Sequence, residues 1–198
     1  GFKGEIEDIS KHLIDTRGLT GCLSLINVNI KNIIINSDKS SCEDSVNLIN
    51  VTGSIKTINI QNSLMDGLDV DFSNIEINQA NITNSKNDCI DLSFGKYILK
   101  KTNLSICGDK GLSVGEKSFV ELDYIKIASS NIGIASKDSS ITKLTDAYLT
   151  NLKTCISAYN KKQEYYGGFL EVQNIECKNY EYKTDVDNNS KVIIKNEL

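Results

Sequence analysis

Three short segments decide how this chain folds: Asp66-Gly67-Leu68-Asp69-Val70, Asp88-Cys89-Ile90-Asp91-Leu92 and Lys110-Gly111-Leu112-Ser113-Val114. Each begins 22 residues after the one before it, and in each the last three residues alternate apolar, polar, apolar. This alternation is typical of a half-buried β-strand. A fixed spacing of this size is the mark of a repeat protein in which every repeat forms one turn of a solenoid.

The same spacing extends through most of the chain. Equivalent segments begin at Asp44, Ile132 and Thr154 without an insertion, and an earlier one begins at Gly21, 23 residues before Asp44. A second apolar strand follows about seven residues after each first strand. A third strand carries apolar residues that are again 22 apart: Ile60, Ile82 and Leu104. We therefore expect three short strands and three corners in each turn.

Composition supports an all-β chain built from many short strands. The sequence contains 27 isoleucines, which favour strands, and 22 asparagines, which favour corners. It contains no proline, as expected if almost every backbone N–H bonds to a neighbouring turn. An antiparallel sandwich does not predict columns that match at 22 residues. The sequence predicts a parallel solenoid of about 8 turns, stacked about 4.8 Å apart.

The scarcity of two residue types excludes some chemistry. The chain has one histidine, His12, and one arginine, Arg17, so a histidine-based triad or an arginine clamp on phosphate is excluded. The net charge is −4 and the lysines are scattered, which argues against a nucleic-acid partner.

The repeat carries a resemblance to a known superfamily. Turns of about 22 residues with inward Ile, Leu and Val and with Asn at the corners resemble the right-handed parallel β-helix of the pectin-lyase-like superfamily. More narrowly, residues 87–92, 108–116 and 134–140 resemble bacterial β-helix modules that accompany CotH-like kinase domains. The resemblance implies an all-β, right-handed parallel β-helix, and a covalently linked catalytic domain in the full-length protein. It implies no particular activity for the module itself.

We expect a single domain over residues 1–198. Residues 1–20 are predicted to form a partial first turn or an N-terminal cap, and residues 21–179 the regular turns with an insertion at 160–168. Residues 180–198 are predicted to form the last turn or a C-terminal cap. Because the chain begins at Gly1 without an initiator methionine, we expect it to be part of a longer protein.

The cysteines suggest free thiols. Cys22, Cys89 and Cys155 share one column but are three turns apart, or roughly 14 Å. A disulfide needs Cα atoms within about 7 Å of each other. The other cysteines lie near corners without an obvious partner: Cys42, Cys107 and Cys177. Reduced cysteines favour the cytoplasm, whereas the fold analogy favours the cell surface or secretion, so the location stays open.

Polar and charged residues form several adjacent columns beside the inward strand, and these columns are the candidate site. The residues to which we assign a catalytic role are Asp69, Asp88, Asp91, Lys110, Glu116 and Lys137. Those expected to bind substrate are Asp44, Asn47, Asp66, Asp71, Asn87, Asp109, Ser113, Asp138, Tyr159, Lys161 and Lys162. The insertion at 160–168 is basic and aromatic, so it is a candidate lid or substrate-contacting loop, although a solvated corner explains it equally well.

Stacked carboxylates repel one another, so a lysine, a proton or a cation must offset them. A carboxyl that keeps its proton has the raised pKa of a general acid. No metal centre is assigned, but calcium could bind the oxygen ligands of Asp66, Asp69, Asp88 and Asp91. A purely structural explanation also exists, because Asp and Asn commonly bond to the backbone at corners.

These observations predict a module that binds, and could modify, an anionic or phosphorylated polysaccharide along the Asp/Lys columns. The partner would be an extended carbohydrate polymer. If the protein is an enzyme, a polysaccharide lyase, a glycoside hydrolase and an epimerase all remain open. The alternative is a non-catalytic scaffold or interaction module attached to an enzymatic domain.

Overall fold

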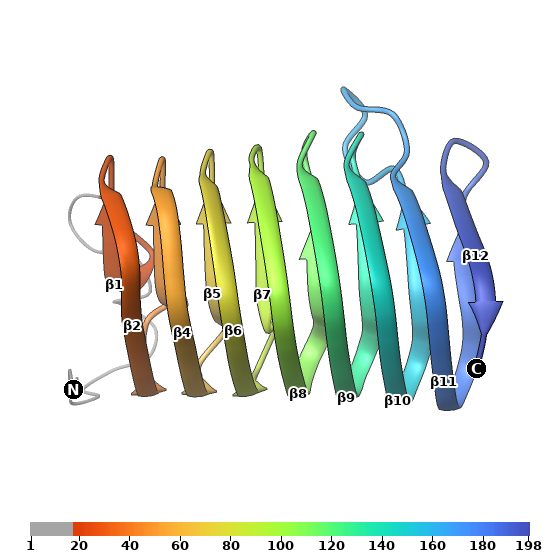
Figure 1. Ribbon diagram of the computed structural model, residues 1–198, viewed down its shortest axis with the longest axis horizontal. Coiled ribbons are helices and arrows are strands. Elements are labelled where there is room, and N and C mark those ends of the chain that lie inside the picture. Colours follow the sequence, from red (N-terminus) through yellow and green to blue (C-terminus); the bar gives the residue numbers. More distant parts are fainter. Residues whose placement is uncertain (1–17) are drawn as a thin grey trace.

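The computed structural model describes residues 18–198. These residues form a parallel β-solenoid of eight turns, which lie side by side along the long axis (Figure 1). The cap or partial turn expected over residues 1–20 falls mostly on residues 1–17, outside the described residues. No helix in the described part is long and apolar enough to cross a membrane.

The twelve strands of the described residues fall into three groups. The short strands of the first four turns are β1 (Gly21–Ile26), β3 (Asp44–Ile49), β5 (Asp66–Asp71) and β7 (Ile90–Ser93). The strands of intermediate length between them are β2 (Asn29–Ser40), β4 (Thr52–Ser63) and β6 (Asn74–Ser85). The later strands are β8 (Lys96–Val114), β9 (Phe119–Lys137), β10 (Ile141–Tyr159), β11 (Phe169–Val186) and β12 (Lys191–Glu197).

Every strand pairs in parallel with its equivalent one turn away, and the pairing confirms the repeat. Asp44 lies opposite Asp66, a step of 22 residues, and Gly21 lies opposite Asp44, a step of 23. Ile141 lies opposite Phe169, a step of 28, because residues 160–168 form a loop between β10 and β11. β12 pairs with β11 and completes the last turn.

The three expected strands of each turn are not separate in the structure. The second and third merge into one strand in β2, β4 and β6, since ladder pairing continues through a bend between them. In β8, β9, β10 and β11 the same strand also runs into the first stretch of the next turn. We refer to β1, β3, β5, β7 and the final residues of β8 to β11 as the stripe strands.

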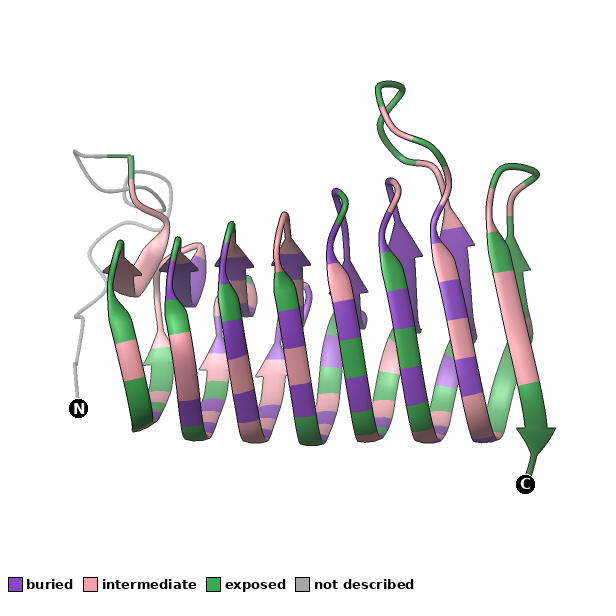
Figure 2. Cartoon of the chain, turned by 45° about the horizontal axis from the view of Figure 1, so that its top comes forward, coloured by how far each residue is buried: buried purple, intermediate pink, exposed green. Residues whose placement is uncertain are grey.

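The core is a stack of aliphatic columns inside the solenoid. Val46, Leu68 and Ile90 are fully buried and lie above one another on the stripe strands. Figure 2 shows buried and more exposed bands alternating along the long strands, as the period-two pattern requires. Burial of these columns supplies the main driving force for folding, because no single turn can bury its own inner face.

Asparagine ladders run along the outside of the turns. The side-chain nitrogen of Asn59 donates to the side-chain oxygen of Asn36 at 2.8 Å, Asn81 donates to Asn59 at 2.9 Å, and Asn103 donates to Asn81 at 3.0 Å. In a second ladder the side-chain nitrogen of Asn84 donates a hydrogen bond to the asparagine side chain one turn earlier. The abundance of asparagine thus has a structural role.

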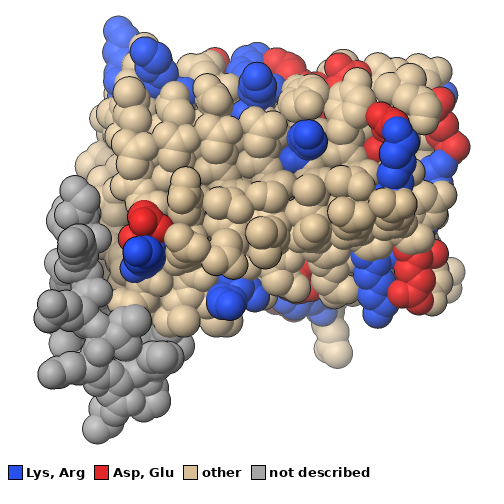
Figure 3. Space-filling view, turned by 90° about the horizontal axis from the view of Figure 1, so that it is seen from below, with Lys and Arg blue, Asp and Glu red and all other residues tan. Residues whose placement is uncertain are grey.

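The underside of the molecule carries a broad band along the long axis with few charged side chains (Figure 3).

The prediction of reduced cysteines is wrong. All six cysteines are paired, as Cys22–Cys42, Cys89–Cys107 and Cys155–Cys177, with Cα atoms 5.3, 5.4 and 6.5 Å apart. Each bond joins the start of a stripe strand to a residue in the following turn. The sequence argument compared cysteines within one column, whereas each true partner lies in a different column, at or near a corner of the next turn. The argument for a cytoplasmic location that rested on free thiols therefore falls.

Candidate functional site

Most of the predicted polar residues lie on the stripe strands or directly beside them. Val46 and Leu48 point into the core, so Asn47, between them, points outward, and the ladder places Asp69, Asp91 and Ser113 beyond it in successive turns. We define the polar stripe by its members in consecutive turns: Asp44, Asn47, Asp66, Asp69, Asp71, Asp88, Asp91, Lys110, Ser113, Lys137 and Tyr159. Many of these side chains are buried, which is unusual for an outer face.

The half of the stripe on β3 and β5 is acidic. Burial, together with the nearby carboxylates of Asp71 and Asp44, raises the pKa of Asp69 to about 9. Burial and the Asp88 carboxylate raise the pKa of Asp66 to about 7. Burial and Asp91 raise the pKa of Asp71 to about 6. These carboxyls are therefore closely spaced acids that are hard to ionise together.

Local hydrogen bonds fix these acids. Asn47 donates its side-chain N–H to Asp69 at 2.8 Å, and Asn87 donates to Asp66 at 2.8 Å. Asp66 also accepts the backbone N–H of Asp88 at 2.7 Å. At the edge of the cluster, burial raises the pKa of Asp44 to about 6 despite a hydrogen bond to Thr20. Within residues 18–198, no lysine pairs with any acid of β3 or β5.

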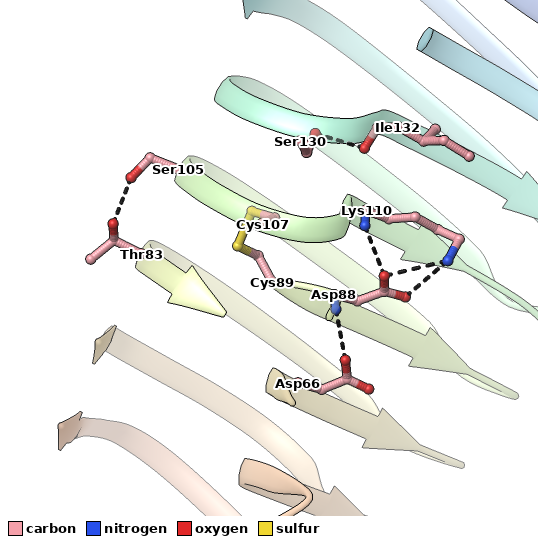
Figure 4. The surroundings of a disulfide bond; sticks show 9 residues. All are labelled: Asp66, Thr83, Asp88, Cys89, Ser105, Cys107, Lys110, Ser130 and Ile132. Atoms are coloured by element: carbon pink, nitrogen blue, oxygen red, sulfur yellow. Dashed lines mark hydrogen bonds and ion pairs between the residues drawn. A yellow bond between two sulfur atoms is a disulfide. The ribbon is translucent and has the colours of Figure 1, made fainter. Parts of the chain in front are cut away.

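Lys110 occupies the stripe one turn beyond Asp88 and neutralises it. Its side-chain nitrogen lies 3.4 Å from Asp88 and also contacts Asp109, and its backbone N–H donates to Asp88 at 2.9 Å. Figure 4 shows the Asp88 carboxylate facing both nitrogens, beside the Cys89–Cys107 disulfide. Burial still raises the pKa of Asp88. For Asp109 burial is also the largest single effect, but the hydrogen bond and charge of Lys110 and the hydrogen bond from Asn131 together outweigh it and lower the pKa.

Lys137 lies along the stripe and reaches back two turns. Its nitrogen is 3.9 Å from Asp91, although Lys137 is on β9 and Asp91 on β7. Gly115, on the turn between them, makes room, since a Cβ there would lie 3.1 Å from the Lys137 side chain. Tyr159 follows Lys137 in the same column, and burial raises the pKa of its hydroxyl. The role of this glycine was not predicted, but a missing side chain directly before the long side chain of Lys137 in the same column is a signal for it.

The loop at 160–168 folds back over the corners of earlier turns. The backbone N–H groups of Lys161 and Lys162 both donate to Asp138 at 2.7 Å. The Lys162 side chain pairs with Glu116, which also accepts a hydrogen bond from Ser93 at 2.6 Å. The loop stands out from the solenoid above β10 and β11 (Figure 1) and is largely exposed (Figure 2). It therefore forms one rim of the stripe, and Ser93 is a supporting residue that the sequence did not single out.

Aromatic rings continue this rim. Phe72 and Phe94 stack with ring centres 4.7 Å apart, and Tyr165 of the loop meets Phe94 edge-on at 6.3 Å. Both phenylalanines directly follow the outermost column of the stripe, after Asp71 and Ser93. An apolar platform thus borders the acidic half.

A metal ion has no prepared ligand set in the described part of the chain. No group of three or more His, Cys, Asp or Glu side chains is arranged there to hold one. Of the four aspartates suggested for calcium, Asp88 is paired with Lys110 and Asp91 lies near Lys137. Calcium binding would need side chains to rearrange, and it stays a prediction.

Comparison with known proteins gives no relative. No protein family, curated protein or solved structure matches this chain. The fold and the polar stripe are therefore the features that bear on its function.

Proposed function

We propose that the polar stripe binds an extended carbohydrate polymer laid across successive turns of the solenoid. The observation that carries the proposal is the row of buried polar and charged side chains on one outer face, bordered by an aromatic rim. Carboxylates and amides hydrogen-bond to sugar hydroxyls, and aromatic rings pack on sugar faces. The resemblance to pectin-lyase-like β-helices agrees with this, since many members act on such polymers, but it is an analogy of fold.

The charged side chains of the stripe bear on the charge of the polymer that would bind there. The sequence suggested an anionic one, for which the lysines would be the anchors. Lys110, Lys137 and Lys162 are each already beside a carboxylate. The acids of β3 and β5 have no such partner among the described residues, so a polyanion would find no cation there and would raise their pKa values further. A polymer without negative charge fits this half of the stripe better.

The test is calorimetric titration with a panel of neutral, amine-bearing and uronate oligosaccharides. The variant Asp91→Asn with Lys137→Gln removes both members of a stripe ion pair, so neither charge is left buried alone. The matched control is Asp123→Asn with Lys100→Gln, an exposed pair with a 3.4 Å separation outside the stripe. We expect at least about tenfold weaker binding in the first variant only. Unchanged binding in a folded stripe variant, or no binding to any oligosaccharide, would overturn the proposal.

A second candidate function is glycoside hydrolysis by Asp69 and Asp91. The two residues are ladder partners on adjacent strands in different surroundings. The raised pKa of Asp69 keeps it protonated at neutral pH, as a general acid must be, whereas Asp91 lies near the positive charge of Lys137. Mass spectrometry of oligosaccharide products checks this, with Asp69→Asn and Asp91→Asn each expected to stop turnover but not binding. Continued turnover in Asp91→Asn would refute it.

A further inference from the structure

Phe72 and Phe94 are held in a backbone conformation that phenylalanine rarely adopts. Both have φ of 52°, in the left-handed region. The equivalent corner residues in the first two turns are Asn27 and Asn50, with φ of 54° and 53°. Asparagine tolerates this region, whereas a bulky side chain there is strained. The corner itself imposes this conformation, since Asp138 has it three turns after Phe72 with φ of 55°. The presence of phenylalanine in place of asparagine therefore needs an explanation other than the backbone.

The feature that phenylalanine adds at this corner is an exposed aromatic ring beside the acids. Phe72 remains 54% exposed although it stacks on Phe94. Asp71 is its neighbour in the chain, so the ring borders the acidic half of the stripe directly. An aromatic face next to carboxyls is a combination that attracts an organic cation, through the ring quadrupole and the negative charge together.

The same region contains a line of buried oxygen atoms that lack hydrogen-bond partners among the described residues. Asn47 is 1% exposed and Ser113 is fully buried, yet the Asn47 side-chain oxygen and the Ser113 hydroxyl have no partner in the described part of the chain. One oxygen of Asp91 is likewise buried without a partner. All three belong to the column that also contains Asp69. Buried acceptors are normally satisfied, so this column fits a ligand that brings donors.

We propose, resting on the proposed function, that the ligand is a polymer of amino sugars with free ammonium groups, bound across β3, β5 and β7 with a sugar ring against Phe72. An ammonium group has three donors and no acceptor, and the amide, carboxylate and hydroxyl oxygens of this column can all accept from it. Its charge offsets the acids of Asp66, Asp69 and Asp71, whose pKa values are raised in the unliganded protein. A bare metal ion would bind the carboxylates but would not explain the exposed aromatic rings beside them.

The test compares three tetrasaccharides of the same linkage: β-1,4-glucosamine, β-1,4-N-acetylglucosamine and β-1,4-glucose. Titrations at about pH 6 keep the amines protonated. We expect the glucosamine oligomer to bind at least about tenfold more tightly than the other two. Equal binding of all three would overturn this inference and leave the proposed function intact, whereas no binding of any would overturn both.

Two variants locate the effect. Asp69→Asn with Asp71→Asn keeps the side-chain shapes and should remove the preference for the amine form. Phe72→Asn restores the residue that suits the left-handed corner, so it should fold at least as well as the parent and weaken binding of all three oligomers. Asp123→Asn and Tyr148→Asn, away from the stripe, are the matched controls and should change neither. A preference for the amine that survives in the double variant would overturn the assignment to these acids.

Calcium titrated without sugar is the remaining arm of the test. Tight calcium binding that disappears in Asp69→Asn with Asp71→Asn would overturn the amine assignment in favour of a metal site. Absence of calcium binding together with amine preference supports it.

Discussion

Individual residues on or beside the polar stripe are held in arrangements that lower the stability of the protein. Asp69 is half-buried among other acids, with a hydrogen bond from Asn47 but no cationic partner in the described part of the chain. Phe72 occupies a corner that suits asparagine. Asp69 lies on the stripe, and Phe72 lies beside it as the next residue after Asp71. Natural proteins retain such local conflicts mainly at functional sites.

The raised pKa values make stability depend on pH in a defined direction. Between about pH 4 and the folded pKa, the folded state holds a proton that the unfolded chain has released, so the free energy of unfolding falls as pH rises. The folded pKa values are about 6 for Asp44 and Asp71, about 7 for Asp66 and about 9 for Asp69. We therefore expect a higher melting temperature near pH 5 than near pH 8.

Asp69→Asn isolates one contributor to that slope. It should stabilise the protein near pH 8 by about 1 kcal/mol or more relative to its effect near pH 5. Thermal unfolding of both proteins at the two pH values checks this, with the exposed Asp123→Asn as control. A slope that is the same in both proteins would contradict the assignment of the raised pKa to Asp69.

At the scale of the strands, the asparagine ladder ties neighbouring turns together. Asn81 donates to Asn59 and accepts from Asn103, so Asn81→Ala removes two hydrogen bonds. Asn103→Ala removes one. At about 1 kcal/mol per bond, the expected losses in unfolding free energy are about 2 and about 1 kcal/mol. Urea denaturation measures both, and equal losses would show that the ladder bonds are not the cause.

The loop at 160–168 shows how an element gains its position from distant residues. Its backbone is held by Asp138, and its Lys162 side chain is held by Glu116 from two turns earlier. A loop anchored in this way forms a defined rim, and the stripe beside it keeps a constant shape. The sequence predicted a loop here but left open whether it was a lid or a solvated corner.

At the scale of the whole molecule, three disulfides join consecutive turns near the beginning, the middle and the end of the solenoid. Cys89–Cys107 closes a segment of 18 residues in the centre. Cross-links of this length typically stabilise a protein by about 3 kcal/mol. We expect Cys89→Ala with Cys107→Ala to lower the unfolding free energy by about that amount in urea denaturation. Addition of a thiol reductant to the parent protein should lower its denaturation midpoint further, because it opens all three bonds, and an unchanged midpoint would contradict the pairing.

The sequence by itself determined the solenoid and the columns. A step of 22 residues places Asp69 beside Asp91 and Leu68 beside Ile90, because parallel stacking leaves each residue one neighbour in the next turn. Only the tertiary structure decided which cysteines pair, that Lys137 reaches past Gly115 to Asp91, and that the loop folds back to Glu116. These contacts cross from one column to another through corners and long side chains. Their geometry depends on the path of the chain at each corner, which the spacing of residues does not specify.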